Sequence, residues 1–240
     1  MTARKVLMAR GLVAACFAWF ALFGAIGDAR GGMVTLWNQS DLALTDPPRG
    51  LLNSDFGDFP DYSAFIVSDI SVPAGGWLVD RLTIWVYAPG GVPTVSNARL
   101  HVFRGATPAG YDPLAASTVE VHARAAAEGP PGVYRVHAEG LGLELNPGTW
   151  FLGLTPEWNF AQWGLTFQVA TRQPIGVKSR WRNPGNGWEF GAGWMDPGYF
   201  DGNLRDFALR VEGVPTPGSA AAVAMLLGVA MGRRRLRQST

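Results

Sequence analysis

The sequence predicts an all-β protein: an antiparallel two-sheet β-sandwich, jelly-roll-like, flanked by a targeting segment at each end. Glycine and proline, 31 and 17 of the 240 residues, are spread along the chain, with spacings of roughly ten residues that are typical of turns between short strands. The runs between them alternate with period two, as strands of sandwiches and barrels do. These runs lie too close together for the crossovers of a parallel sheet.

The clearest strand runs from Trp77 to Tyr87. Leu82, Ile84 and Val86 share one face, and the opposite face is also largely apolar, which indicates a central strand buried on both sides. Further strands are expected at residues 33–37, 64–67, 99–104, 118–124, 133–137, 141–145, 149–155, 165–170 and 207–211.

The first 29 residues have the order of a secretory signal peptide. Basic residues precede an apolar run over 11–26, and Gly27 and Ala29 place small residues where a signal peptidase reads. The sequence therefore predicts a signal peptide at 1–29. Two alternatives are an uncleaved anchor helix and a lipoprotein signal at Cys16, the only cysteine.

The C-terminal segment, residues 214–240, has three parts in a fixed order. It contains the Pro/Gly break Val214, Pro215, Thr216, Pro217 and Gly218, an apolar run over 220–231, and the basic stop Arg233, Arg234, Arg235 and Arg237. The run covers only about 20 Å as a helix, so we expect a transient membrane span with the basic stop on the inside. The sequence thus predicts three regions: 1–29, a β-sandwich domain over 30–213, and a sorting tail over 214–240.

This tail resembles the PEP-CTERM class of bacterial sorting signals, in which a proline motif precedes a short hydrophobic helix and an arginine-rich end. The usual motif is Val-Pro-Glu-Pro, and Thr216 stands here at the glutamate position. The resemblance implies an exosortase-type membrane transpeptidase as partner. It also implies export to the cell envelope or surface with a transient membrane anchor, and a cut near residues 215–217.

A second, looser resemblance lies at Asp69–Trp77, Asp-Ile-Ser-Val-Pro-Ala-Gly-Gly-Trp. It is similar to a phrase of secreted bacterial β-sandwich proteins with such tails, for which no activity is assigned. Its proline and glycines also predict a turn between two strands, with Trp77 covering the mouth of that turn.

The composition of the body excludes some functions. Residues 30–214 contain 13 Lys and Arg and 18 Asp and Glu, a net charge of −5. This mildly acidic domain argues against nucleic-acid binding, which needs a basic face. The body contains no cysteine, so its stability is expected to come from packing.

Three aspartates lie close together in a Gly/Pro loop: Asp55, Asp58 and Asp61. Crowded carboxylates can supply the oxygen ligands that Ca²⁺ prefers, although aspartates also favour such loops because they cap turns. Apart from this candidate calcium site, no cofactor is expected.

An aromatic loop follows, with Trp181, Trp188, Trp194 and Tyr199 among Gly, Asn and Pro residues. Aromatic rings on turns can stack on sugar faces, which makes these four residues a candidate glycan-binding surface. The sequence favours the other interpretation, in which the rings fold back as lids on the sandwich ends, because tryptophans bury large areas.

Catalytic signals are weak. His101, His122 and His137 have the outward phase of their strands, and the pattern predicts three solvent-facing residues. The Gly-x-Ser-x-Gly and His-Glu-x-x-His motifs do not occur. The sequence therefore favours a secreted, non-enzymatic structural or adhesive protein of the extracellular matrix. The alternatives are a carbohydrate-binding module that contacts exopolysaccharide and, third, a secreted hydrolase.

Overall fold

The computed structural model describes residues 32–45, 48–91, 94–105, 117–176 and 178–216. The expected signal peptide, and the tail from Pro217 onward, lie outside the described residues. The account below concerns the compact unit that begins at Val34.

The described residues form fourteen strands, mostly antiparallel. In the first half of the chain these are β1 (Val34–Asn38), β2 (Gly50–Leu52), β3 (Asp55–Phe56), β4 (Phe65–Val72), β5 (Trp77–Tyr87) and β6 (Asn97–Arg104). They continue as β7 (Ser117–Ala127), β8 (Val133–Ala138), β9 (Leu143–Leu145), β10 (Gly148–Trp158), β11 (Phe167–Val169), β12 (Arg180–Arg182), β13 (Trp194–Met195) and β14 (Leu209–Pro215). The short helices are η1 (Pro60–Tyr62), α2 (Phe160–Trp163) and η4 (Pro197–Tyr199). The all-β prediction is confirmed.

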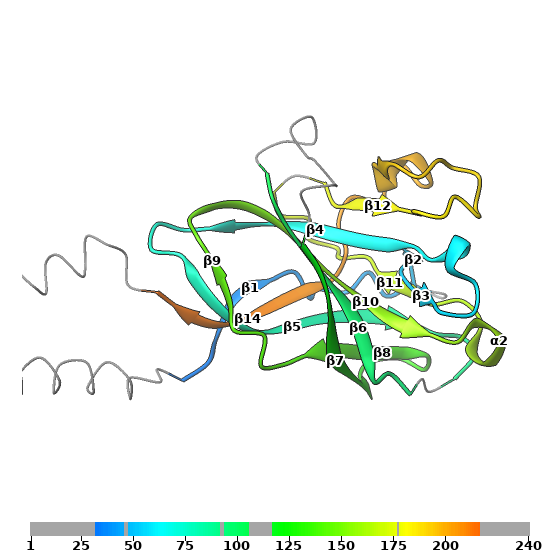
Figure 1. Ribbon diagram of the computed structural model, residues 1–240, viewed down its shortest axis with the longest axis horizontal. Coiled ribbons are helices and arrows are strands. Elements are labelled where there is room, and N and C mark those ends of the chain that lie inside the picture. Colours follow the sequence, from blue (N-terminus) through cyan, green and yellow to red (C-terminus); the bar gives the residue numbers. More distant parts are fainter. Residues whose placement is uncertain (1–31, 46–47, 92–93, 106–116, 177, 217–240) are drawn as a thin grey trace, which may run out of the picture. The chain divides into compact units, whose positions relative to one another are not determined.

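The strands follow one hydrogen-bonded path, β1-β14-β5-β8-β7-β6-β10-β4-β12-β13, which curls on itself (Figure 1). The strand β7 joins its two halves, because residues 117–122 pair with β6 and residues 123–127 pair with β8. The expected division into two separate sheets is therefore not confirmed. Nothing in the alternating sequence of β7 marks the point where its partner changes.

The predicted turn between β4 and β5 is present. Gly75 and Gly76 adopt positive φ angles of 116° and 85°, and the Gly76 N–H donates to the carbonyl of Pro73 at 3.0 Å. Trp77 is buried directly after it. The two strands are not neighbours in the sheet, so this turn carries the chain from one half to the other instead of closing a hairpin.

The main core lies between the two halves of the curled sheet. Leu82, Ile84 and Val86 of β5 belong to it, as the alternation predicted. Residues of β4 and β10, including Ile70 and Leu154, belong to the same cluster, so both halves share one core. Burial of this apolar surface is the main stabilising contribution of the fold.

Both halves also bury residues on their outer faces. Trp85 packs with Val133, Val169 and Ala208 outside β5. On the outer face of the other half, Val67, Phe103 and Phe151 pack with Trp194. Residues from short strands and loops, such as Trp194 and Ala208, thus cover the outer faces of the sheet. The alternating pattern by itself would predict that these faces are exposed to solvent.

Several predicted strands have different bounds or partners. The runs at 133–137 and 141–145 correspond to β8 and β9, but both pair with β5 and not with each other. The short strands β2, β3, β12 and β13 were not predicted. With two or three residues each, they are too short to show a period.

The last strand extends beyond the expected domain boundary at residue 213. Val214 and Pro215 pair with Leu78 and Trp77 of β5, and the Thr216 N–H donates to the carbonyl of Gly76 at 3.1 Å. The first half of the proposed sorting motif is therefore part of the sheet. In the part of the chain that the structure describes, no helix is long and apolar enough to cross a membrane.

Candidate functional site

Trp181 of the aromatic loop is a core residue. Its side chain is 2 % exposed, and its indole Nε1 donates to the carbonyl of Leu52 at 3.0 Å. The strand β12 pairs with β4, which places Trp181 inside the main cluster. Trp181 is therefore no glycan contact, because a buried ring cannot reach a polymer in solvent. Its ring folds back onto the core, as the favoured interpretation expected.

The other three predicted aromatic residues lie at different places. Trp188 is partly buried and donates through Nε1 to the carbonyl of Tyr62 at 2.8 Å. Trp194 packs on Phe103 with ring centroids 5.5 Å apart. Tyr199 is 69 % exposed. Only Tyr199 presents most of its ring to solvent, so the structure does not bring the four together as one sugar-stacking platform.

The three aspartates of the candidate calcium site have separate contacts. Asp55 is buried and forms an ion pair with Arg99 of β6. Asp58 accepts hydrogen bonds from the backbone N–H groups of Phe160 and Ala161, both at 3.3 Å. The side chain of Asp61 is exposed. Among the described residues, no group of three or more His, Cys, Asp or Glu side chains could hold a metal ion.

The three histidines differ in environment. His122 is exposed, but His101 is 1 % exposed, so the prediction of solvent exposure is wrong for His101. The ring of Phe65 lies 4.8 Å from the imidazole, and Phe103 stacks on it at 6.4 Å. Burial, followed by the charges of Arg99 and Arg182, lowers the pKa of His101 to about 3.

A buried chain of polar side chains begins at His101. Thr155 Oγ1 donates to Asn53 Oδ1 at 2.7 Å, Asn53 Nδ2 donates to Gln168 Oε1 at 2.7 Å, and Gln168 Nε2 donates to the carbonyl of Ala208 at 3.1 Å. This chain of hydrogen bonds was not predicted from the sequence. Asn53 lies 102 residues before Thr155 and 115 residues before Gln168, and the residues share no motif. It crosses the interior and satisfies buried polar groups, which is a structural role.

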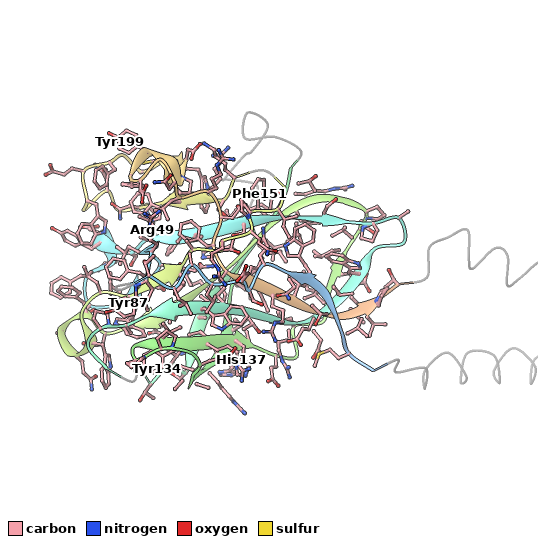
Figure 2. The ribbon with its side chains drawn as sticks, turned by 180° about the vertical axis from the view of Figure 1, so that it is seen from behind. Arg49, Tyr87, Tyr134, His137, Phe151 and Tyr199 are labelled. Atoms are coloured by element: carbon pink, nitrogen blue, oxygen red, sulfur yellow. The ribbon has the colours of Figure 1, made fainter. Side chains whose placement is uncertain are left out.

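The described residues form a groove at one end of β5. It encloses about 400 Å³ and is lined by Pro48, Arg49, Gly50, Leu51, Tyr87, Phe167, Phe200, Asp201 and Leu204. We call it the Tyr87 groove. Figure 2 shows Arg49 and Tyr87 at the same end of the domain. Its volume falls in the range of small-molecule sites.

Three structural elements position the walls of the groove. Tyr87 ends β5 and lies directly opposite Phe167, the first residue of β11. Phe200 and Asp201 follow η4, and the turn closes where the Leu204 N–H donates to the carbonyl of Asp201 at 2.8 Å. The Asn203 N–H donates to Asp201 Oδ1 at 2.9 Å, which orients the carboxylate.

Gly132 sets the position of the Tyr87 ring. A Cβ atom at Gly132 would lie 2.8 Å from the ring, and the residue has a φ of 84°, which side chains with a Cβ rarely adopt. The Ala88 N–H donates to the carbonyl of Gly132 at 2.8 Å. The absence of a side chain therefore lets the ring pack against the backbone beside the groove.

The groove combines aromatic rings with one cationic and one anionic side chain. Such rings can stack on the apolar face of a sugar, while Arg49 donates to hydroxyl oxygens and Asp201 accepts from hydroxyl groups. None of the four aromatic residues predicted from the sequence lines this surface; Phe200, which directly follows Tyr199, does. Compared with known proteins, the chain matches no family model, no curated protein and no solved structure.

Proposed function

We propose that this protein is an exported, surface-sorted, non-enzymatic adhesive component of the extracellular matrix, and that its Tyr87 groove binds a neutral segment of exopolysaccharide. The observation that carries the binding role is the groove itself, with Tyr87, Phe167 and Phe200 beside Arg49 and Asp201. Sugar recognition uses this combination of stacking surface and few polar groups.

The composition of the groove favours binding over catalysis. Asp201 is the single carboxylate among its described lining residues. Glycoside hydrolysis generally uses a pair of carboxyl groups that flank the bond to be broken. A lone carboxylate that is oriented by a turn suits a hydrogen-bond acceptor for a hydroxyl group. We therefore place the hydrolase alternative behind the binding role.

The route to the surface is proposed from the two ends of the chain. The apolar segment at 1–29 would direct export, and the segment at 214–240 would hold the protein in the membrane until an exosortase-type transpeptidase acts. We also propose a sandwich-like, jelly-roll description for the domain, with its two sheet halves as layers. The core that both halves share supports that description.

The binding proposal is tested by calorimetric titration of the purified full-length chain with soluble cello-oligosaccharides, dextran and mannan. We expect at least one of them to bind, and Tyr87→Ala to weaken that binding by about tenfold or more, as for an aromatic residue at the centre of an interface. Tyr199→Ala is the matched control, because Tyr199 is an exposed tyrosine outside the groove lining.

The outcomes separate the alternatives. Loss of binding in Tyr87→Ala with retention in Tyr199→Ala supports the groove. The reverse pattern assigns binding to the aromatic loop and rejects the groove, and absence of heat with all three polymers rejects the glycan role. Equal thermal unfolding midpoints of both variants exclude misfolding as the cause.

A further inference from the structure

A second, polar cavity lies on the outer face of β5, around the middle of the strand. It encloses about 160 Å³ and is lined by Arg81, Thr83, Arg135, His137, Glu139, Arg210 and Glu212. We call it the arginine cavity. Its lining residues come from β5, β8 and β14 and from the residue that follows β8, and Figure 2 labels His137 among them. None of these residues belongs to the lining of the Tyr87 groove.

The strand register brings these charges together. Thr83 lies opposite Arg210 of β14 on one side and opposite His137 of β8 on the other. Arg81 lies opposite Glu212, and Arg135 lies opposite Trp85. The cavity is therefore built on three adjacent strands whose hydrogen bonds hold the side chains in place.

The ion pairs around the cavity leave one of its three arginines unpaired. Arg81 lies between two carboxylates, 3.1 Å from Glu139 and 3.4 Å from Glu212. Arg210 has no carboxylate partner among the described residues, and its guanidinium lies 5.0 Å from the centre of the Trp85 ring. Arg135 pairs through Nη1 with Glu128, which lies outside the lining, at 2.9 Å. Arg210 is therefore the one arginine of the lining that has no ion pair among the described residues. The stacking on Trp85 orients the unpaired cation.

Three nitrogen atoms of the lining residues are buried without a hydrogen-bond partner in the described structure. They are Nε of Arg81, Nε of Arg135 and Nδ1 of His137. The N–H groups along one edge of a guanidinium can donate two parallel hydrogen bonds to a carboxylate that lies in the same plane. The network is thus incomplete by two donors and one imidazole nitrogen.

The imidazole supplies an acceptor. His137 Nε2 lies 3.1 Å from Glu139 Oε1, and an ionised carboxylate requires that this nitrogen carry the hydrogen. Burial lowers the pKa of His137, although Glu139 acts in the opposite direction, so the ring is neutral at pH 7. Nδ1 then holds a lone pair, which can accept from a hydroxyl group.

We infer that the arginine cavity binds a carboxylate with a neighbouring hydroxyl group, as in a uronic acid unit of an acidic polysaccharide. The guanidinium groups of Arg210 and Arg135 bind the carboxylate, and His137 accepts from the hydroxyl. This site is independent of the Tyr87 groove, whose Asp201 suits a neutral sugar. A free hydroxy acid has the same chemistry as the polymer unit, so the test includes both.

The test is calorimetric titration of the purified full-length chain at about 50 mM salt, where screening is weak. The probes are polygalacturonate, free galacturonate, neutral dextran and dextran sulfate. We expect polygalacturonate to bind, and dextran sulfate to bind at least about tenfold more weakly per charge, because its sulfate groups replace hydroxyl groups from which His137 would accept.

The variants assign the site. Arg210→Gln should weaken polygalacturonate binding by about tenfold, whereas Glu212→Gln should strengthen it by about threefold because it frees Arg81 from a competing carboxylate. Arg104→Gln is the matched control: its guanidinium also stacks on a tryptophan, 5.7 Å from the Trp150 ring, but on another strand. None of the three should change binding of a neutral polymer at the groove.

Opposite effects of Arg210→Gln and Glu212→Gln support the proposal, since misfolding cannot strengthen binding. Binding of free galacturonate also supports the proposal. If polygalacturonate binds and free galacturonate does not, the ligand is a unit of the polymer. Equal losses in Arg210→Gln and Arg104→Gln, equal affinity for dextran sulfate, or no binding of either uronate overturns the proposal. Loss of dextran binding in Tyr87→Ala with uronate binding retained would separate the two sites.

Discussion

Nε2 of His101 lies 3.1 Å from Oγ1 of Thr155, and this contact determines which hydrogen the buried imidazole carries. The Thr155 hydroxyl donates its own hydrogen to Asn53 Oδ1 at 2.7 Å, so it can only accept from His101. The low pKa of His101 keeps the imidazole neutral, so its single ring hydrogen is on Nε2. It begins a one-directional chain of hydrogen bonds that ends at the carbonyl of Ala208.

The first prediction concerns the loss of stability of the domain at low pH. The pKa of His101 is about 3 in the folded protein and about 6.5 in an unfolded chain, so the unfolded state binds more protons between these values. The contribution of neutral His101 to stability is present above pH 6.5 and is lost as pH falls, by about 2 kcal/mol at pH 5. Urea unfolding between pH 7 and pH 4 measures this loss.

The control for this prediction is His101→Gln, which keeps a donor for Thr155 but does not titrate. Its stability should fall less between pH 7 and pH 5 than that of the native chain. Burial raises the pKa of Asp206, which acts in the opposite direction and is present in both proteins. Parallel pH curves for the two proteins would contradict the role given to His101.

The second prediction concerns Trp181. Trp181→Ala should lower the free energy of unfolding by about 3–5 kcal/mol, because it opens a large cavity and leaves the carbonyl of Leu52 without its donor. Trp188→Ala, at a partly buried ring of the same loop, should cost clearly less. Chemical denaturation measures both. Equal costs would place Trp181 outside the core.

The third prediction concerns Gly153 in β10. A Cβ atom there would overlap with the backbone carbonyl of Ile66, which cannot move without disturbing β4. Gly153→Ala should therefore destabilise the domain by about 2 kcal/mol or more. Gly193→Ala is the matched control, since nothing lies within 4 Å of a Cβ atom at Gly193. A neutral effect of Gly153→Ala in thermal unfolding would show that the two strands can separate locally.

The fourth prediction concerns the sorting motif and rests on the proposed export. Val214 and Pro215 belong to β14, and Thr216 Oγ1 and N–H both donate to the Gly75–Gly76 turn. A cut that removed these residues would take the end of a central strand from the sheet. We therefore expect the mature C-terminus to lie at Thr216 or beyond. Mass spectrometry of the surface-extracted protein checks this, and a mature chain that ends before Thr216 contradicts it.

The alternating pattern of a strand predicted burial correctly where both faces of the strand are apolar. The alternation in β5 placed Leu82, Ile84 and Val86 in the core as expected. The same rule failed for His101, because phase states which face a residue occupies and not whether another segment covers that face. Trp194 and Phe103 pack together on that face, and they are ninety-one positions apart in the chain.

The candidate sites depended still more on distant contacts. Asp55, Asp58 and Asp61 are close in sequence, yet Asp55 pairs with Arg99 and Asp58 with the start of α2. The Tyr87 groove unites residues from four separate stretches of the chain and the arginine cavity from three, and no spacing in the sequence marks either site.

By itself the sequence determined the all-β class, the absence of disulfides in the body and the apolar and basic ordering of the two ends, since these depend on composition and short-range period. Tertiary structure alone decided that one curled sheet replaces two separate ones, that Trp181 and His101 are buried, and that three arginine and two glutamate side chains line one cavity with Thr83. The physical reason is that strand pairing and the covering of a face are set by contacts between distant segments, which no local pattern encodes.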